Sequence, residues 1–301
     1  MTNNIPFSRD LEFEYGVVDR IGPGIRRVIA RNPSPFTLYG TGTYIVGEGT
    51  VAVIDPEIPE HFEALMNALK GEVVSDIVIT HTHSDHSPLS RQLAQETGAR
   101  ICGYGGLLPS QKVKDEGFPR MEEAIDQNIK LDVDLADGDL VEGNDWTLEA
   151  VHTPGHIANH MCYAFREVNV LFSGDHVMGW STSVIIQPDG NMSDYMNSLR
   201  LLLKRSESVY WPTHGPAIND PKPFVRAYID HRLNRERQIH EQLKIGVGSI
   251  QAMVKELYAN VPQELHPAAG QSVYAQIMKM IDDGYVVCDG IPQLNSLYAL
   301  K

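Results

Sequence analysis

The sequence predicts an α/β fold followed by a small winged-helix-like domain, and three features of the chain support this prediction. Strand-like and helix-like segments alternate in the order β-α-β-α-β up to residue 103, which is typical of α/β proteins. Strand-like segments return between residues 131 and 175. After residue 249 the pattern changes to two helices and a closing hairpin. We expect three parts, which are a main domain over residues 1–222, a connecting helix over 223–245 and the winged-helix-like domain over 246–301.

The alternation in the first part of the chain rests on local composition and periodicity. β-branched and aromatic residues predict strands, and apolar residues that recur every three or four positions from Phe62 to Leu69 predict an amphipathic helix. Gly98 ends a second helix, since glycine readily adopts the left-handed conformation common at helix ends. The expected strands cover residues 25–30, 38–46, 51–54, 77–80 and 99–103, and the expected helices cover 59–69 and 90–97.

The second part of the chain continues with strands and two helices, and then changes character. The expected strands cover residues 140–141, 147–151, 161–165, 168–172 and 209–211, and the expected helices cover 195–203 and 223–243. The Gly246-Val247-Gly248-Ser249 stretch breaks this pattern and marks the expected domain boundary. Beyond it, apolar residues at helical spacing predict two short helices, and residues 285–300 predict a hairpin.

The overall composition is that of a globular protein with a negative net charge. The chain has 301 residues, 42% of them apolar, with 25 basic and 39 acidic side chains and a formal net charge of −14. This balance argues against charge-driven binding to nucleic acid or to an anionic membrane. The winged-helix-like domain contains three lysines, no arginine and five acidic residues, so we expect no binding to double-stranded DNA. We expect it to pack against the main domain or to form the contact of a homodimer.

Three absences in the sequence set expectations about location and disulfides. No stretch approaches 18 uninterrupted apolar residues, so we expect neither a transmembrane helix nor a membrane partner. The N-terminus lacks the basic and apolar regions of a secretory signal. Cys102, Cys162 and Cys288 lie far apart without CxxC spacing, which argues against a disulfide framework and against a thiolate zinc site. We therefore expect a cytoplasmic protein.

A run of histidine and aspartate follows directly after the expected strand 77–80. In extended backbone, alternate side chains share a face, so His81, His83 and Asp85 can converge on one point. His86 is out of phase and points to an adjacent position. Imidazole and carboxylate groups suit zinc, with iron or manganese as alternatives. The motif therefore predicts two metal ions bound close together.

Three later candidate ligands also stand just beyond expected strands. His156 ends the motif TPGH, Asp175 ends SGD, and His214 lies in THG. The full set of candidate metal ligands is His81, His83, Asp85, His86, His156, Asp175 and His214. If one carboxylate bridges two metal ions, seven ligands leave each ion with an open coordination position. An open position is typical of catalytic metal sites. Asp55, at the end of the expected strand 51–54, is interpreted as a carboxylate that orients one of these ligands.

The order HTHSDH, TPGH, SGD and THG resembles the metallo-β-lactamase-fold hydrolases, in which an αββα sandwich holds a dinuclear metal site at one edge. The resemblance implies two ligand sets, which are His81, His83 and His156 for the first metal and Asp85, His86 and His214 for the second. It also implies that Asp175 bridges the two ions. One flank differs, because Ser87-Pro88-Leu89 stands where many family members have two glycines.

A narrower resemblance covers nearly the whole chain. The segments 32–44 and 195–199, with the pairs His231-Arg232 and Arg235-Glu236, look like the β-lactamase-like protein 2 group, whose members also end in a winged-helix-like domain. Animal members of that group are described as endoribonucleases that act on single-stranded RNA. The resemblance makes Arg232 and Arg235 candidates for substrate contact, and the alternative for both is a solvated or salt-bridged helix face.

Together these features predict a metal-dependent hydrolase with two zinc ions that share a bridging hydroxide. Asp85 is expected to orient this hydroxide as well as to bind the second metal. The expected substrate is a small acyl, lactone or thioester compound. Two alternatives remain open, which are an endoribonuclease specific for single-stranded RNA and a non-enzymatic metal-binding protein that interacts through its winged-helix-like domain.

Overall fold

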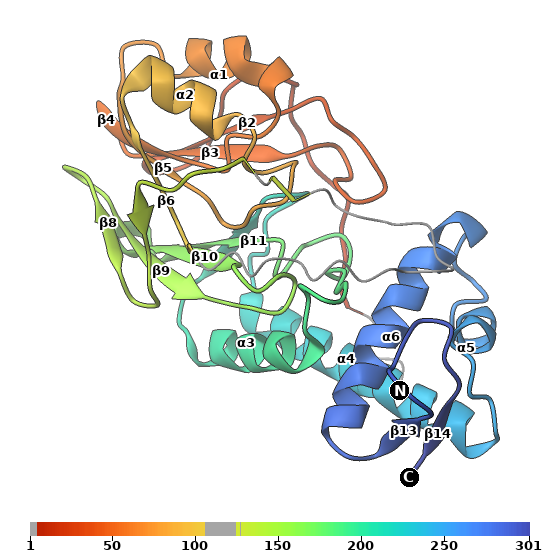
Figure 1. Cartoon of the computed structure of the whole chain (residues 1–301). Coiled ribbons are helices and arrows are strands. Elements are labelled where there is room, and N and C mark those ends of the chain that lie inside the picture. Colours follow the sequence, from red (N-terminus) through yellow and green to blue (C-terminus); the bar gives the residue numbers. More distant parts are fainter. Residues whose placement is uncertain (1–4, 106–124, 127) are drawn as a thin grey trace.

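The computed structural model describes residues 5–105, 125–126 and 128–301, and Figure 1 shows two β-sheets with helices on their outer sides. The first sheet has seven strands in sequential order. They are β1 (Asp19–Gly22), β2 (Ile25–Ile29), β3 (Gly42–Val46), β4 (Thr50–Ile54), β5 (Val73–Val78), β6 (Arg100–Gly103) and β7 (Val133–Asp134). The first four strands pair antiparallel, and β4 to β7 pair parallel.

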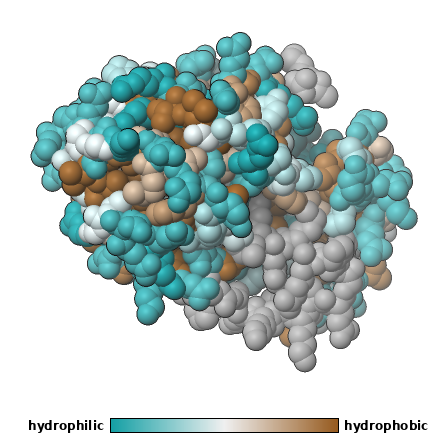
Figure 2. All heavy atoms as spheres, turned by 90° about the horizontal axis from the view of Figure 1, so that it is seen from above, coloured by the Kyte–Doolittle hydropathy of each residue, from teal (hydrophilic) through white to brown (hydrophobic). Residues whose placement is uncertain are grey.

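Short helices cover the outer face of this first sheet (Figure 1). They are η1 (Pro59–His61), α1 (Phe62–Ala68) and α2 (Ser90–Thr97). Leu65 of α1 and Leu93 of α2 belong to one buried apolar cluster with the strand residues Val53 and Ile77. Seen from this side, the surface is mostly hydrophilic with scattered apolar side chains (Figure 2), because the helices turn their apolar stripes onto the sheet.

The second sheet has five strands in the order β12-β11-β10-β9-β8. They are β8 (Leu140–Glu142), β9 (Thr147–His152), β10 (Met161–Phe165), β11 (Val170–Gly174) and β12 (Val209–Pro212), with η2 (Arg166–Val168) between β10 and β11. Tyr163 and Phe172 of this sheet share a buried cluster with Tyr44 and Ile54 of the first sheet. The apolar core between the two sheets is therefore continuous.

Two longer helices cover the outer face of the second sheet, which completes the expected αββα sandwich. They are α3 (Met192–Lys204) and α4 (Pro221–Lys244). Leu199 of α3 and Tyr228 of α4 share a buried cluster with Ala164 and Leu171 of the sheet. No helix in the described part of the chain, the 24-residue α4 included, has the length and apolar character needed to cross a membrane.

The C-terminal part forms a small winged-helix domain with its own core. It contains α5 (Ile250–Leu257), η3 (Gln263–Leu265), α6 (His266–Asp282) and an antiparallel hairpin of β13 (Val286–Cys288) and β14 (Tyr298–Leu300). Met253 and Ile277 lie in its core. On α6, Ala275 joins the cluster under the second sheet, and Lys279 forms an ion pair of 3.0 Å with Glu236 of α4. This domain therefore packs against the main domain.

Several elements differ from the expectation, and local backbone geometry explains two of them. The strand expected from residue 38 begins only at Gly42, because Leu38 and Gly40 have φ angles of 57° and 139°, which a strand does not adopt. The expected helix 59–69 is divided between η1 and α1, since Pro59 opens a turn of 3₁₀ helix before the α-helix begins. β1 was not expected, because its sequence Asp-Arg-Ile-Gly has no apolar run.

Candidate metal centre

Four loops meet at one edge of the sandwich, and each follows the end of a strand. The loop after β5 carries residues 81–86, and the loops after β9, β11 and β12 carry His156, Asp175 and His214. The structure brings all seven candidate ligands into three overlapping groups, and the ligand atoms within each group lie within 4.8 Å of one another. Segments more than 100 residues apart in sequence therefore contribute to one site.

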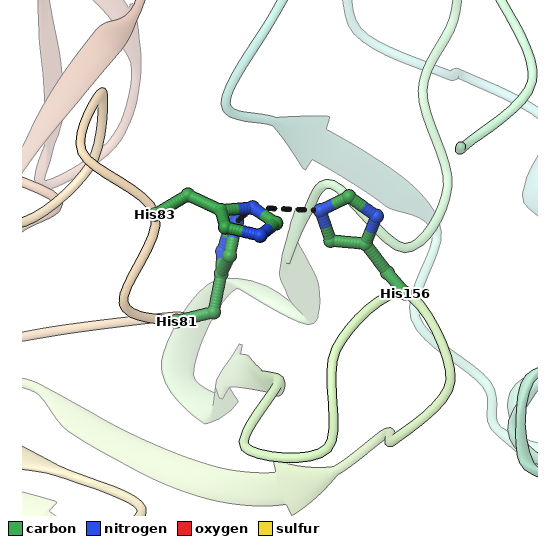
Figure 3. Close-up of side chains that lie close together, drawn as sticks. All are labelled: His81, His83 and His156. Atoms are coloured by element: carbon green, nitrogen blue, oxygen red, sulfur yellow. Dashed lines mark hydrogen bonds between the residues drawn. The ribbon is translucent and has the colours of Figure 1, made fainter. Parts of the chain in front are cut away.

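The first group consists of three imidazoles that face a common point. Figure 3 shows the rings of His81, His83 and His156 turned toward one another. His83 Nδ1 lies 2.8 Å from His81 Nε2 and 3.1 Å from His156 Nε2. Burial, together with the charge of neighbouring imidazoles, holds the pKa of His81 well below its usual range. A neutral imidazole is the form that binds a metal, so His81 is in the state that metal binding needs.

The second group combines a carboxylate with two imidazoles. Asp85 Oδ2 lies 3.2 Å from His214 Nε2, and Asp85 Oδ1 lies 3.7 Å from His86 Nε2. Burial alone would lower the pKa of both histidines, but the nearby carboxylates outweigh it and raise the pKa of His86 well above its usual range and that of His214 to about 10. In the metal-free protein this half of the site therefore holds positive charge between carboxylates.

Asp175 lies between the two groups. Its Oδ2 atom is 3.6 Å from His86 Nε2 and 3.5 Å from His214 Nε2, and it also forms a group with His81 and His86. Burial would raise the pKa of this carboxyl, but the two histidines hold it well below its usual range. A carboxylate that reaches members of both groups is a candidate for a ligand shared by two metal ions.

The residues present fit metal ions. Asp175 Oδ1 is buried and has no hydrogen-bond partner among the described residues, while His86 Nε2 and His214 Nε2 are buried and face only carboxylate oxygens at 3.2–3.7 Å. An unpaired buried polar atom costs about 1–3 kcal/mol, and coordination to a metal would satisfy these atoms. Imidazole nitrogen combined with carboxylate oxygen is also a donor set that zinc, iron and manganese accept.

The local backbone corrects one expectation from the sequence. The run after β5 does not remain extended, because a turn begins at His83 and the His86 N–H donates to the His83 carbonyl at 3.0 Å. Asp85 therefore does not converge with His81 and His83 as simple alternation predicts. The turn carries Asp85 to the side of His86 and His214, in the grouping that the family resemblance implies.

The carboxylate of Asp55 contacts the candidate ligand His86 on the side of the ring that faces away from the other ligands. His86 Nδ1 lies 2.9 Å from Asp55 Oδ2, and Thr80 donates its N–H to Asp55 Oδ1 at 2.7 Å. The Thr213 hydroxyl donates to Asp55 Oδ2 at 3.1 Å, and the Asp55 side chain is fully buried. When Nδ1 of His86 donates to this carboxylate, Nε2 is left free to face the metal centre. The carboxylate thus has the geometry expected of an orienting group.

Two more candidate ligands contact backbone carbonyls, and the sequence did not predict these contacts. His156 Nδ1 lies 2.6 Å from the Val184 carbonyl oxygen, and His214 Nδ1 lies 3.2 Å from the Gly40 carbonyl oxygen. Every residue except the last has a carbonyl, so side-chain identity carries no signal for such partners. Only the approach of the 178–184 segment and of Gly40 to the site reveals them.

His160, a histidine outside the ligand set, also touches the centre. Its Nε2 accepts the N–H of Asp175 at 3.1 Å, and its Nδ1 lies 2.9 Å from the Thr153 hydroxyl. Burial and neighbouring histidines hold the pKa of His160 well below its usual range. This ring therefore joins the loop that bears His156 to the loop that bears Asp175.

The two arginines considered for substrate contact lie on α4 and are held by the protein itself. Arg232 is buried, donates from Nη2 to the Ser183 carbonyl and lies over the ring of Tyr195. Arg235 donates to the Leu257 carbonyl at 3.1 Å and lies 4.0 Å from the ring centroid of Tyr258. Arg232 is therefore not on a solvated helix face, and Arg235 is only partly exposed to solvent. Their contacts fasten α4 to the main domain and to the C-terminal domain.

Two regions of the chain match known protein families. Residues 37–214 match the model of the metallo-beta-lactamase superfamily. The chain belongs to this superfamily. Residues 249–291 match the beta-lactamase associated winged helix domain, which confirms the nature of the C-terminal domain. With its clustered histidine and aspartate side chains, this superfamily member is a metal-dependent hydrolase.

Relatives of the chain agree with this assignment. It is 31% identical to a beta-lactamase-like protein 2 homolog of Caenorhabditis elegans, over 89% of this chain and 88% of the relative. It is 30% identical to an atrochrysone carboxyl ACP thioesterase of Aspergillus chevalieri, over 87% of this chain and 82% of the relative. A metallo-beta-lactamase family protein of Thermus thermophilus shares the fold, with a TM-score of 0.75, 20% identity and coverage of 93% and 99% of the two chains.

Proposed function

We propose that this protein hydrolyses an acyl thioester at a centre of two metal ions. The observation that carries the proposal is the pair of ligand groups that share one buried carboxylate, Asp175. His81, His83 and His156 would hold one ion, and Asp85, His86 and His214 would hold the other. A bound divalent metal would lower the pKa of water to about 7 and polarise an acyl carbonyl.

Asp85 is the ligand with a second role in this proposal. Its side chain is 24% exposed, whereas those of His86 and His214 are fully buried. One carboxylate oxygen is 3.2 Å from His214, and a carboxylate that is partly exposed to solvent can accept a hydrogen bond from the attacking water. Asp85 therefore would orient the nucleophile as well as bind a metal.

A thioester is favoured over single-stranded RNA as the substrate for two reasons. A relative with 30% identity over most of both chains is named a thioesterase. In addition, Arg232 and Arg235 are engaged by backbone carbonyls and aromatic rings, so they do not offer free cations to phosphates. RNA binding needs such cations, and the chain has a net charge of −14.

The metal content provides the first test. Protein purified without chelator should contain close to two transition-metal ions per chain, mainly zinc, because two ligand groups are preformed. Elemental analysis of the intact protein measures this directly. A metal-free protein that is fully active would end the proposal, and one ion per chain would contradict the dinuclear centre.

The substrate class is tested with a panel assay of metal-analysed protein. The panel contains an acyl-N-acetylcysteamine thioester, a lactone, a chromogenic β-lactam and single-stranded RNA. We expect thioester hydrolysis to exceed the other activities, to stop on chelation and to return on addition of zinc. Asp85→Asn is the control, because a genuine activity must fall in this variant while that of a contaminant persists. RNA cleavage that Asp85→Asn abolishes, without thioester hydrolysis, would overturn the assignment.

A further inference from the structure

Two side chains on one face of α4 fasten this helix to the segment 178–184. Tyr228 and Arg232 are four residues apart and therefore neighbours on the helix surface. The Tyr228 hydroxyl accepts the N–H of Met178 at 3.1 Å and donates to the Ser181 carbonyl at 2.5 Å. Arg232 donates to the carbonyl of Ser183. Hydrogen bonds from α4 thus hold this segment at Met178, Ser181 and Ser183.

The residue after Ser183 contacts the metal centre. The Val184 carbonyl oxygen lies 2.6 Å from Nδ1 of His156, whose Nε2 faces His83. The position of this carbonyl fixes the rotation of the His156 ring, since Nδ1 must point toward it. Arg232 holds the peptide immediately before this carbonyl. A displacement of the 183–184 backbone would therefore turn the His156 ring.

Arg232 also contacts the ring of Tyr195, which in turn contacts the loops that carry His156 and Asp175. Its guanidinium carbon lies 5.3 Å from the ring centroid of Tyr195, and the hydroxyl of Tyr195 donates to the His176 carbonyl at 2.8 Å. The backbone of Tyr195 also packs closely on Gly155. A Cβ atom added to Gly155 would lie 2.3 Å from the backbone atoms of Tyr195. Gly155 precedes His156, and His176 follows Asp175. Arg232 thus packs against the Tyr195 ring, and Tyr195 contacts both the loop that carries His156 and the loop that carries Asp175.

We propose that Arg232 is a positioning residue of the metal centre, which keeps the His156 ring directed at His81 and His83. This inference rests on the proposed metal site and adds a residue that contacts neither metal nor substrate. Arg232 is buried, with 4% of its surface exposed, and combines a donor for a carbonyl with a planar face for an aromatic ring. Lysine can replace the charge and the donor, but it lacks the planar face.

The experiment compares Arg232→Met and Arg232→Lys with Arg235→Met as the matched control. Arg235 lies on the same helix and also combines a carbonyl contact with an aromatic one, but its partners belong to the C-terminal domain. Zinc affinity of the full chain is measured by competition with a chelator, and thermal unfolding of the metal-free protein is measured in parallel. We expect Arg232→Met to weaken binding of one zinc ion about 10-fold or more. Arg232→Lys should lose less, and Arg235→Met should bind zinc like the unaltered protein even if it unfolds at a lower temperature.

Zinc binding by the unaltered protein tests the proposed metal centre, and zinc binding by the Arg232 variants tests the positioning role. If the unaltered protein binds no zinc, the proposed metal centre itself fails. If it binds two ions and Arg232→Met binds them equally tightly, the positioning role is wrong. An equal loss of affinity in Arg235→Met would show general loosening and would also overturn it. If Arg232→Met does not fold, Arg232→Lys decides, and unchanged zinc affinity in that variant contradicts the proposal.

Discussion

Asp175→Ala is expected to remove both metal ions from the protein and to abolish hydrolysis. Asp175 Oδ2 lies 3.6 Å from His86 Nε2 and 3.5 Å from His214 Nε2, and its carboxylate also forms a group with His81. Removal of a residue that only orients a ligand already costs about 10–100-fold in metal affinity, so loss of a shared ligand should cost more at each ion. Elemental analysis after gel filtration and a chelator competition measure both ions.

His214→Ala is the matched control for this prediction, because His214 belongs to one ligand group only. We expect it to weaken mainly one ion, and to leave the group of His81, His83 and His156 loaded. The two variants should therefore differ in the number of ions lost as well as in activity. Selective loss of the same single ion in both variants would contradict a bridging role for Asp175.

Asp55→Ala is expected to have the second largest effect, on both metal affinity and stability. Asp55 accepts hydrogen bonds from Thr80 and Thr213 and contacts Nδ1 of His86, all in a fully buried position. Each donor left unpaired costs about 1–3 kcal/mol, so the free energy of unfolding should fall by several kcal/mol. Zinc affinity should fall about 10–100-fold, because the His86 ring loses its orienting partner.

Asp55→Asn separates the two effects. The amide retains the shape and one oxygen acceptor, so more of the stability should be kept than in Asp55→Ala. Its NH₂ group can donate to Nδ1 of His86 and so favour the tautomer with the proton on Nε2, which is the wrong one for a ligand. We expect weak zinc binding in a protein that unfolds nearer the normal temperature. Wild-type zinc affinity in both Asp55 variants would show that this carboxylate does not orient His86.

The sequence predicted the seven candidate ligands because each stands just beyond a strand. Apolar, β-branched runs such as Val51–Ile54 mark strands locally, and a polar residue that follows such a run lies at a sheet edge. The structure confirms the αββα sandwich and gathers these residues at one edge. The C-terminal domain was also predictable, since periodicity changes at a glycine-rich break.

The grouping of the ligands needed the folded backbone or the family resemblance. Simple alternation placed Asp85 with His81 and His83, but a hydrogen bond from the His86 N–H to the His83 carbonyl makes a turn there. A turn of this kind depends on a single contact within four residues, which periodicity does not resolve. The correct neighbours of Asp85 are His86 and His214.

The chain by itself determined most of the order of elements, the residue types of the candidate ligands and the place of Asp55 at a strand end, because these depend on local pattern and on residue type. Only the tertiary structure decided the partners of His156 and His214, which are the carbonyls of Val184 and Gly40. It also decided that Arg232 is buried against Tyr195 rather than exposed to substrate. The physical reason is that these contacts join segments 28 to 174 residues apart, and backbone carbonyls look alike in every sequence.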